Sequence, residues 1–142
     1  MFASPSADPT GPKLSLLWLF AILNIVFRDL HEMTTADTLT ALLEGRMNGV
    51  PVTEAALLAG GVAVEMLLLA MLLSAVLPRP PARWLNLILA PIVLLGVFYI
   101  PPADPDDYFF AAVVTLTLMV IFVTAWRWNG PRGVAVRGSH VS

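Results

Sequence analysis

The chain has 142 residues, of which 58% are hydrophobic and 13% charged, with a formal net charge of -2 and a mean hydropathy of +0.80. A soluble domain usually carries about 25% charged residues, so this chain has too few charges to cover a soluble surface. Its apolar content and low net charge also exclude a disordered chain. Because the sequence has no cysteine, disulfides, thiolate metal sites and iron–sulfur clusters are excluded. These numbers predict a small integral membrane protein.

Four apolar runs have about the 20-residue length that crosses roughly 30 Å of hydrocarbon. They cover residues 14–30, 55–77, 84–100 and 108–126, and each stops at a polar or proline-rich signal. A cleaved signal peptide is the alternative for the first run, although no small-residue cleavage site follows it. We therefore predict an all-α fold, an integral membrane four-helix bundle over residues 14–128, with flexible cytoplasmic tails at 1–13 and 129–142.

The connection between the first two runs, residues 31–53, is the longest of the chain. Within it, residues 35–44 predict a short interfacial helix, with Thr35 as its N-cap and Gly45 or Gly49 at its end. One face of this helix would be apolar, formed by Leu39, Leu42 and Leu43. We expect it to lie on the bundle or on the lipid surface. A partly ordered loop is the alternative.

Positively charged residues predict the orientation in the membrane. With four passes, the two tails and the second connection share one side, and they hold Lys13, Arg79, Arg83, Arg127, Arg132 and Arg137. Positive residues favour the cytoplasm, so both termini are predicted to be cytoplasmic. Aromatic residues near the segment ends predict an interfacial belt, made of Trp18, Trp84, Tyr99, Tyr108, Trp126 and Trp128.

Polar side chains inside the apolar runs are the candidate functional residues, because such groups are costly in hydrocarbon. Glu65 lies near the middle of the second run, and Arg28 lies at a similar depth in the first, one turn after Asn24 and beside Asp29. We predict that Glu65 pairs with Arg28 or Asn24. Three further polar positions are secondary candidates: Asn86, Thr115 and Thr117.

Three interpretations of this cluster are open. The polar groups can hold the helices in register. They can form a proton or substrate site in which Glu65 changes its protonation. In the third interpretation, Glu65 contacts another subunit or a lipid headgroup.

The sequence lacks the motifs of several classes of enzyme and binding protein. The sequence has no HExxH, GxSxG or P-loop pattern, and no basic stripe for nucleic acid. Asp29, His31 and Glu32 are too close in sequence to share one helix face as metal ligands. We therefore predict no cofactor, no metal and no nucleic-acid partner. The expected partners are the lipid bilayer, other membrane subunits or a second copy of the chain.

Four segments together resemble a family of small four-pass bacterial integral membrane proteins of unknown function. They are LSLLWLFAILNIVFRDL, TADTLTALLEGRMNGVPVTEAALLAGGVAVEMLLLAMLLSAVL, ARWLNLILAPIV and AWRW. The resemblance covers residues 14–128, and it includes Asn24, Asp29, Glu65, Arg83-Trp84, Asn86 and Trp126-Arg127-Trp128. Arg28 departs from the pattern, where an uncharged residue is expected. The resemblance implies a four-helix bundle in the bacterial inner membrane and no particular substrate.

The leading functional hypothesis is a small non-enzymatic accessory or scaffold protein, as a subunit of a larger membrane complex. It follows from a chain that is nearly all membrane helix and has no catalytic motif. The alternative is a small oligomeric proton-coupled transporter centred on Glu65. A third hypothesis is an enzyme for a lipid-soluble substrate, with Asp29, His31 and Glu32 at the outer face.

Overall fold

The computed structural model describes residues 8–47, 49–99, 102 and 104–128. Its four long helices are α1 (Thr10–Glu32), α3 (Glu54–Val76), α4 (Arg79–Val97) and α5 (Pro105–Arg127). Each is long and apolar enough to cross a membrane. The connection between α1 and α3 holds a short helix, α2 (Ala36–Leu43), and two antiparallel strands, β1 (Arg46–Met47) and β2 (Val50–Pro51). The predicted all-α fold with four membrane-length helices is confirmed.

Helices α1, α4 and α5 begin three or more residues before the apolar runs predicted from residues 14, 84 and 108. Helix α1 begins at Thr10, inside the segment predicted as a tail, and the carboxylate of Asp8 accepts the Thr10 backbone N–H at 3.0 Å. This bond satisfies one of the free N–H groups at the helix start. Helix α4 begins at Arg79, so the prolines that were predicted to form a loop occupy its first turn. A proline there loses no helical hydrogen bond, because the first N–H groups have no intrahelical acceptor.

The predicted short helix is present as α2. The Thr35 hydroxyl accepts the backbone N–H of Thr38 at 3.4 Å, and Gly45 ends the helix with a φ of +71°. Helix α2 has no buried residue, and Leu43 is 91% exposed, so it does not lie on the bundle. The strand pair after it was not predicted, because strands of two residues are too short to show an alternating pattern.

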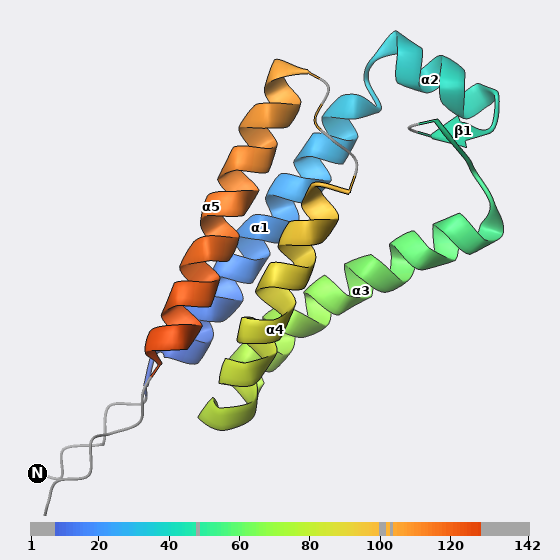
Figure 1. Ribbon diagram of the computed structural model, residues 1–142. Helices are drawn as coiled ribbons and strands as arrows, with labels where there is room; N and C mark the ends of the chain where they lie inside the picture. The colour runs from blue at the N-terminus through green and yellow to red at the C-terminus, as the bar shows by residue number, and fades with distance from the viewer. Residues whose placement is uncertain (1–7, 48, 100–101, 103, 129–142) are drawn as a thin grey trace, which may run out of the picture.

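The long helices form a ring in which α1 contacts α3 and α5, while α4 contacts α5 and α3. Figure 1 shows α1, α4 and α5 running side by side, whereas α3 diverges from them toward its N-terminal end. In α3 only Ala70 and Ser74 are buried, and every residue from 54 to 66 is exposed. The bundle is therefore closed at the end where α3 finishes and open at the end where α3 begins.

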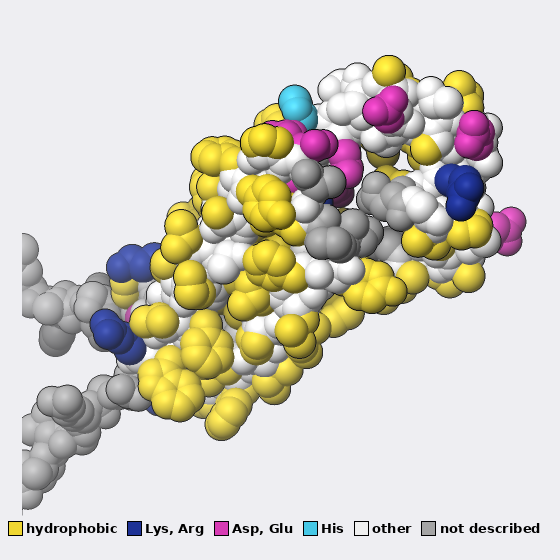
Figure 2. Space-filling model, turned by 45° about the horizontal axis from the view of Figure 1, so that its top comes forward, with side chains coloured by type: hydrophobic (Ala, Val, Ile, Leu, Met, Phe, Trp, Pro, Cys, Tyr) yellow, Lys and Arg dark blue, Asp and Glu magenta, His cyan; other side chains and the backbone are white. Residues whose placement is uncertain are grey.

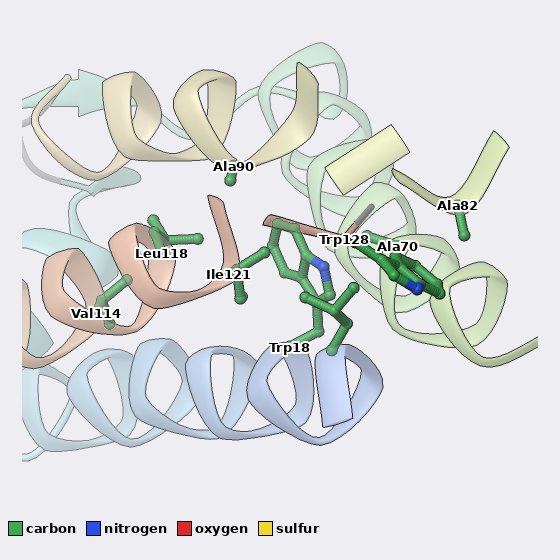
Figure 3. Close-up of a cluster of buried hydrophobic side chains, with 9 residues drawn as sticks. Trp18, Ala70, Ala82, Ala90, Val114, Leu118, Ile121 and Trp128 are labelled. Atoms are coloured by element: carbon green, nitrogen blue, oxygen red, sulfur yellow. The ribbon is translucent and has the colours of Figure 1, made fainter. Parts of the chain in front are cut away.

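The closed end contains the core (Figure 3). Its buried apolar residues are Leu14, Trp18, Ala70, Ala82, Ala90, Val114, Leu118, Ile121 and Trp128. Trp18 and Trp128 are thus buried, and their assignment to an interfacial belt was wrong. Trp84, Tyr99, Tyr108 and Trp126 are exposed, as a belt requires.

A buried hydrogen-bond network joins three helices in this core. The Trp18 indole N–H donates to Asn86 Oδ1 at 2.6 Å, and the Asn86 side-chain amide donates to Ser74 Oγ at 2.9 Å. All three side chains are fully buried. The network links α1, α4 and α3, and it satisfies polar groups that hydrocarbon would leave without partners.

Close backbone approach accompanies the network. A Cβ added at Gly11 of α1 would lie 2.7 Å from the carbonyl oxygen of Ser74 in α3.

The guanidinium of Arg83 joins α4 to the end of α5. It donates to the carbonyl oxygens of Ala125 and Trp126 at 3.1 and 3.2 Å. A cation at these carbonyls stabilises the C-terminal end of α5.

Asp8 connects the start of α1 to the end of α5. The hydroxyl of Thr10 donates to Asp8 Oδ1 at 2.6 Å, and the Trp128 indole N–H donates to Asp8 Oδ2 at 2.5 Å. These hydrogen bonds, that of Thr10 first and that of Trp128 second, lower the pKa of Asp8 below its usual value. The ionised carboxylate therefore connects the start of α1 to the end of α5.

Candidate functional site

Arg28 pairs with a carboxylate other than the one predicted. Its guanidinium Nε lies 2.9 Å from Asp107 Oδ1, and the two side chains are 17% and 9% exposed. Asp107 stands in the first turn of α5, where the helix dipole also favours a negative charge. The pair joins the end of α1 to the start of α5.

The predicted partner, Glu65, lies elsewhere. It is the central residue of α3, roughly 16 Å from either end at ~1.5 Å per residue. It lies about 140° and 180° around the helix from the buried residues Ala70 and Ser74, at ~100° per residue, and it is exposed. Within the described ranges it has no hydrogen-bond or ion-pair partner. The Arg28–Glu65 pair was therefore wrong, because the packed face of α3 is set by its small residues and leaves Glu65 on the opposite side.

Asn24 does not reach Glu65 either. Its side-chain amide donates to the Phe20 carbonyl of its own helix at 2.9 Å. Thr117 makes the same kind of bond, to the Val113 carbonyl at 2.8 Å. The Thr115 hydroxyl oxygen is buried with no partner in the described part of the chain. Of the secondary candidates, only Asn86 joins helices.

A cavity of about 370 Å³ lies where α3 diverges from the other long helices. Helix α1 contributes a face with i, i+3, i+4 and i+7 spacing, formed by Ile25, Arg28, Asp29 and Glu32. The other walls are mostly apolar, and they include Met66 and Leu67 of α3, Val93 and Gly96 of α4, and Phe110 and Val114 of α5. Arg28 and Asp29 of the predicted cluster thus line one cavity, whereas Glu65 and Asn24 are not among its lining residues.

Acidic side chains gather around this open end, beside a histidine (Figure 2). His31 Nε2 lies 3.1 Å from Asp106 Oδ2, and both side chains are about half exposed. In the portion of the chain that is described, no three His, Asp or Glu side chains lie close enough to hold a metal ion. The exposed histidine–carboxylate pair is a contact between α1 and α5 at the rim.

Residues 9–130 match the family of unknown function DUF6326. The chain belongs to this family. The predicted resemblance to a family without an assigned function is thereby confirmed, while the DUF6326 description states neither a membrane location nor a bacterial origin. Comparisons with curated proteins and with solved structures give no significant match.

Sequence reasoning missed one residue at the cavity end, Asp107. Asp107 was not among the candidate residues, yet it is buried against Arg28. Glu32, which was named only in the enzyme hypothesis, lines the cavity. A signal for Asp107 was present: in an up-and-down bundle, the end of the first helix and the start of the last lie at the same membrane face. An arginine and an aspartate at those two places are natural partners.

Proposed function

We propose that this protein is a small non-enzymatic accessory or scaffold subunit of a larger complex in the bacterial inner membrane. One observation carries the proposal: Glu65, at the centre of a membrane-length helix, faces away from the chain's own bundle. A charged side chain at the bilayer centre costs about 2.5–3.5 kcal/mol, so such groups normally face protein. A partner protein on this face of α3 removes that cost by donating a hydrogen bond or a cation.

The other residues on the Glu65 face of α3 are also suited to contact with a partner protein. Gly61 lies one turn before Glu65, and a Cβ added there would meet no atom within 4 Å among the residues that the structure describes. Leu58 and Leu72 continue the face and are 69% and 53% exposed. Because Gly61 has no side chain, a second helix can approach closely enough to form a hydrogen bond with the nearby Glu65 carboxyl group. Both termini stand on the cytoplasmic side in this proposal, by the distribution of positive residues.

The test is purification of the tagged full-length protein from its own host membrane in a mild detergent, with mass measurement of the intact particle. The matched variants are Gly61→Leu and Gly60→Leu. Neither new Cβ meets an atom of the described residues within 4 Å, and of the two positions it is 61 that shares the Glu65 face. We expect a particle of fixed stoichiometry that Gly61→Leu breaks and Gly60→Leu leaves intact. Glu65→Leu should also release the partner.

A protein that emerges alone, as a monomer or as a homo-oligomer of defined mass, overturns the accessory proposal. Equal effects of the two glycine variants overturn the assignment of the interface to the Glu65 face.

The alternative is an oligomeric proton-coupled transporter centred on Glu65. The same exposed position supports it, since a second copy packed on α3 would place two Glu65 carboxyls at one interface. Glu65→Gln separates the proposals: a transporter loses proton-coupled flux in proteoliposomes while its oligomer persists. An accessory subunit shows no flux in either form, and changes only in assembly or stability.

A further inference from the structure

The cavity at the open end combines features that no proposed role uses. It has a volume of about 370 Å³, within the ~300–1,000 Å³ typical of small-molecule pockets. Apolar side chains from all four long helices form its walls, and an aromatic ring, that of Phe110, is among them. Charged side chains enter it from α1 only. The cavity therefore offers an apolar interior and a charged rim.

The charge at this rim is unbalanced. Arg28, Asp29 and Glu32 all line the cavity, but the Arg28 guanidinium is held by Asp107 at 2.9 Å. Among the residues that the structure describes, neither the Asp29 nor the Glu32 carboxyl group forms an ion pair with a cation. The nearby His31 is paired with Asp106 and does not line this cavity. Two acidic side chains without an ion-pair partner among the described residues thus line a mostly apolar cavity.

We propose that this cavity binds a cationic amphiphile, a molecule with an ammonium group and a short apolar tail. The ammonium lies between the Asp29 and Glu32 carboxylates, and the tail extends between α3 and α4 toward Met66 and Gly96. An anionic ligand is disfavoured because it would lie beside the two carboxyl groups of Asp29 and Glu32. A zwitterionic headgroup is also disfavoured, because Arg28, the cation among the described residues that line the cavity, is already paired with Asp107.

Glycine at position 96 gives a direct way to test the cavity. A Cβ added there meets no atom of the described residues within 4 Å, so a larger side chain enters the cavity without displacing a packed group among them. Gly60 of α3 has the same open surroundings but does not line the cavity. Gly96→Leu and Gly60→Leu are therefore a matched pair, with the same substitution in a membrane-length helix, near the end of α4 and within α3.

The probe is octyltrimethylammonium, titrated calorimetrically into the full-length protein in nonionic detergent micelles, with protein-free micelles subtracted. We expect saturable binding that Gly96→Leu abolishes and Gly60→Leu retains. Asp29→Asn and Glu32→Gln should each weaken binding about tenfold, as expected for loss of one charged contact. Helical circular dichroism and a single elution peak establish that each variant is folded.

Octanol and octylphosphocholine carry the same tail with a neutral and a zwitterionic head. Both should bind at least tenfold more weakly than the ammonium probe. Equal binding of octanol, or of octylphosphocholine, overturns the charge argument. Unchanged ammonium binding in Gly96→Leu overturns the site, even if the carboxylate variants weaken binding.

Discussion

Removal of the Asn86 side chain tests the buried network at the closed end. Asn86→Ala deletes the acceptor of the Trp18 indole N–H and the donor to Ser74, two contacts between helices at 2.6 and 2.9 Å. In membrane proteins such contacts contribute on average about 0.6 kcal/mol each, and up to about 1.7 kcal/mol. The buried indole N–H is also left without a partner, which costs about 1–3 kcal/mol. Because these terms overlap, we expect a loss of about 2–3 kcal/mol in the free energy of unfolding.

Asn24→Ala is the matched control. Asn24 is also an asparagine inside a membrane-length helix, but its amide bonds only to the Phe20 carbonyl of the same helix. The gain in helix propensity from asparagine to alanine is the same at both sites, so it cancels in the comparison. We expect Asn24→Ala to change the free energy of unfolding by no more than about 0.5 kcal/mol.

The measurement is unfolding of the purified protein in mixed micelles of increasing sodium dodecyl sulfate content, followed by helical circular dichroism. A loss for Asn86→Ala no larger than that for Asn24→Ala refutes the role of the network in joining the helices. A double-mutant cycle with Trp18→Phe adds a second check. Since Trp18 and Asn86 are in direct contact, their combined effect should be smaller than the sum of the single effects; full additivity contradicts the contact.

Three further predictions concern other contacts, measured by the same unfolding assay. Arg28→Ala should cost about 1–3 kcal/mol, because it leaves the buried carboxylate of Asp107 without its guanidinium; a loss below that of an exposed surface substitution counts against the ion pair. Gly11→Val should cost about 1–3 kcal/mol, because its Cβ would meet a backbone oxygen of α3 at 2.7 Å, whereas Gly60→Ala, in open space, should be neutral or slightly stabilising. The pKa of Asp8 is lowered in the folded protein, so its contribution is complete above its unfolded pKa of about 3.9 and is lost as the pH falls below that value. The stability difference between the wild type and Asp8→Asn should therefore shrink below about pH 4; a difference that is constant down to pH ~3 contradicts the hydrogen-bonded carboxylate.

The sequence by itself determined which segments are helices. Four long apolar runs separated by prolines and charges leave helices as the conformation that satisfies every backbone group in hydrocarbon. The short helix was also predictable, since Thr35 and Gly45 act through local bonds and local φ angles. The starts of α1, α4 and α5 were placed too late, because polar and proline residues in a first turn look the same as a loop.

Only the tertiary structure decided which faces meet. The pattern of α3 is apolar on every side, so its sequence gives no preferred face, and Glu65 was assigned to the interior by its cost in lipid alone. Packing instead follows small residues such as Ala70 and Ser74, which let α3 approach the start of α1. The same contact makes α3 diverge, opens the cavity beside Asp29, and turns Glu65 outward. Partner choice between helices depends on shape complementarity over many residues, which no single position in the sequence records.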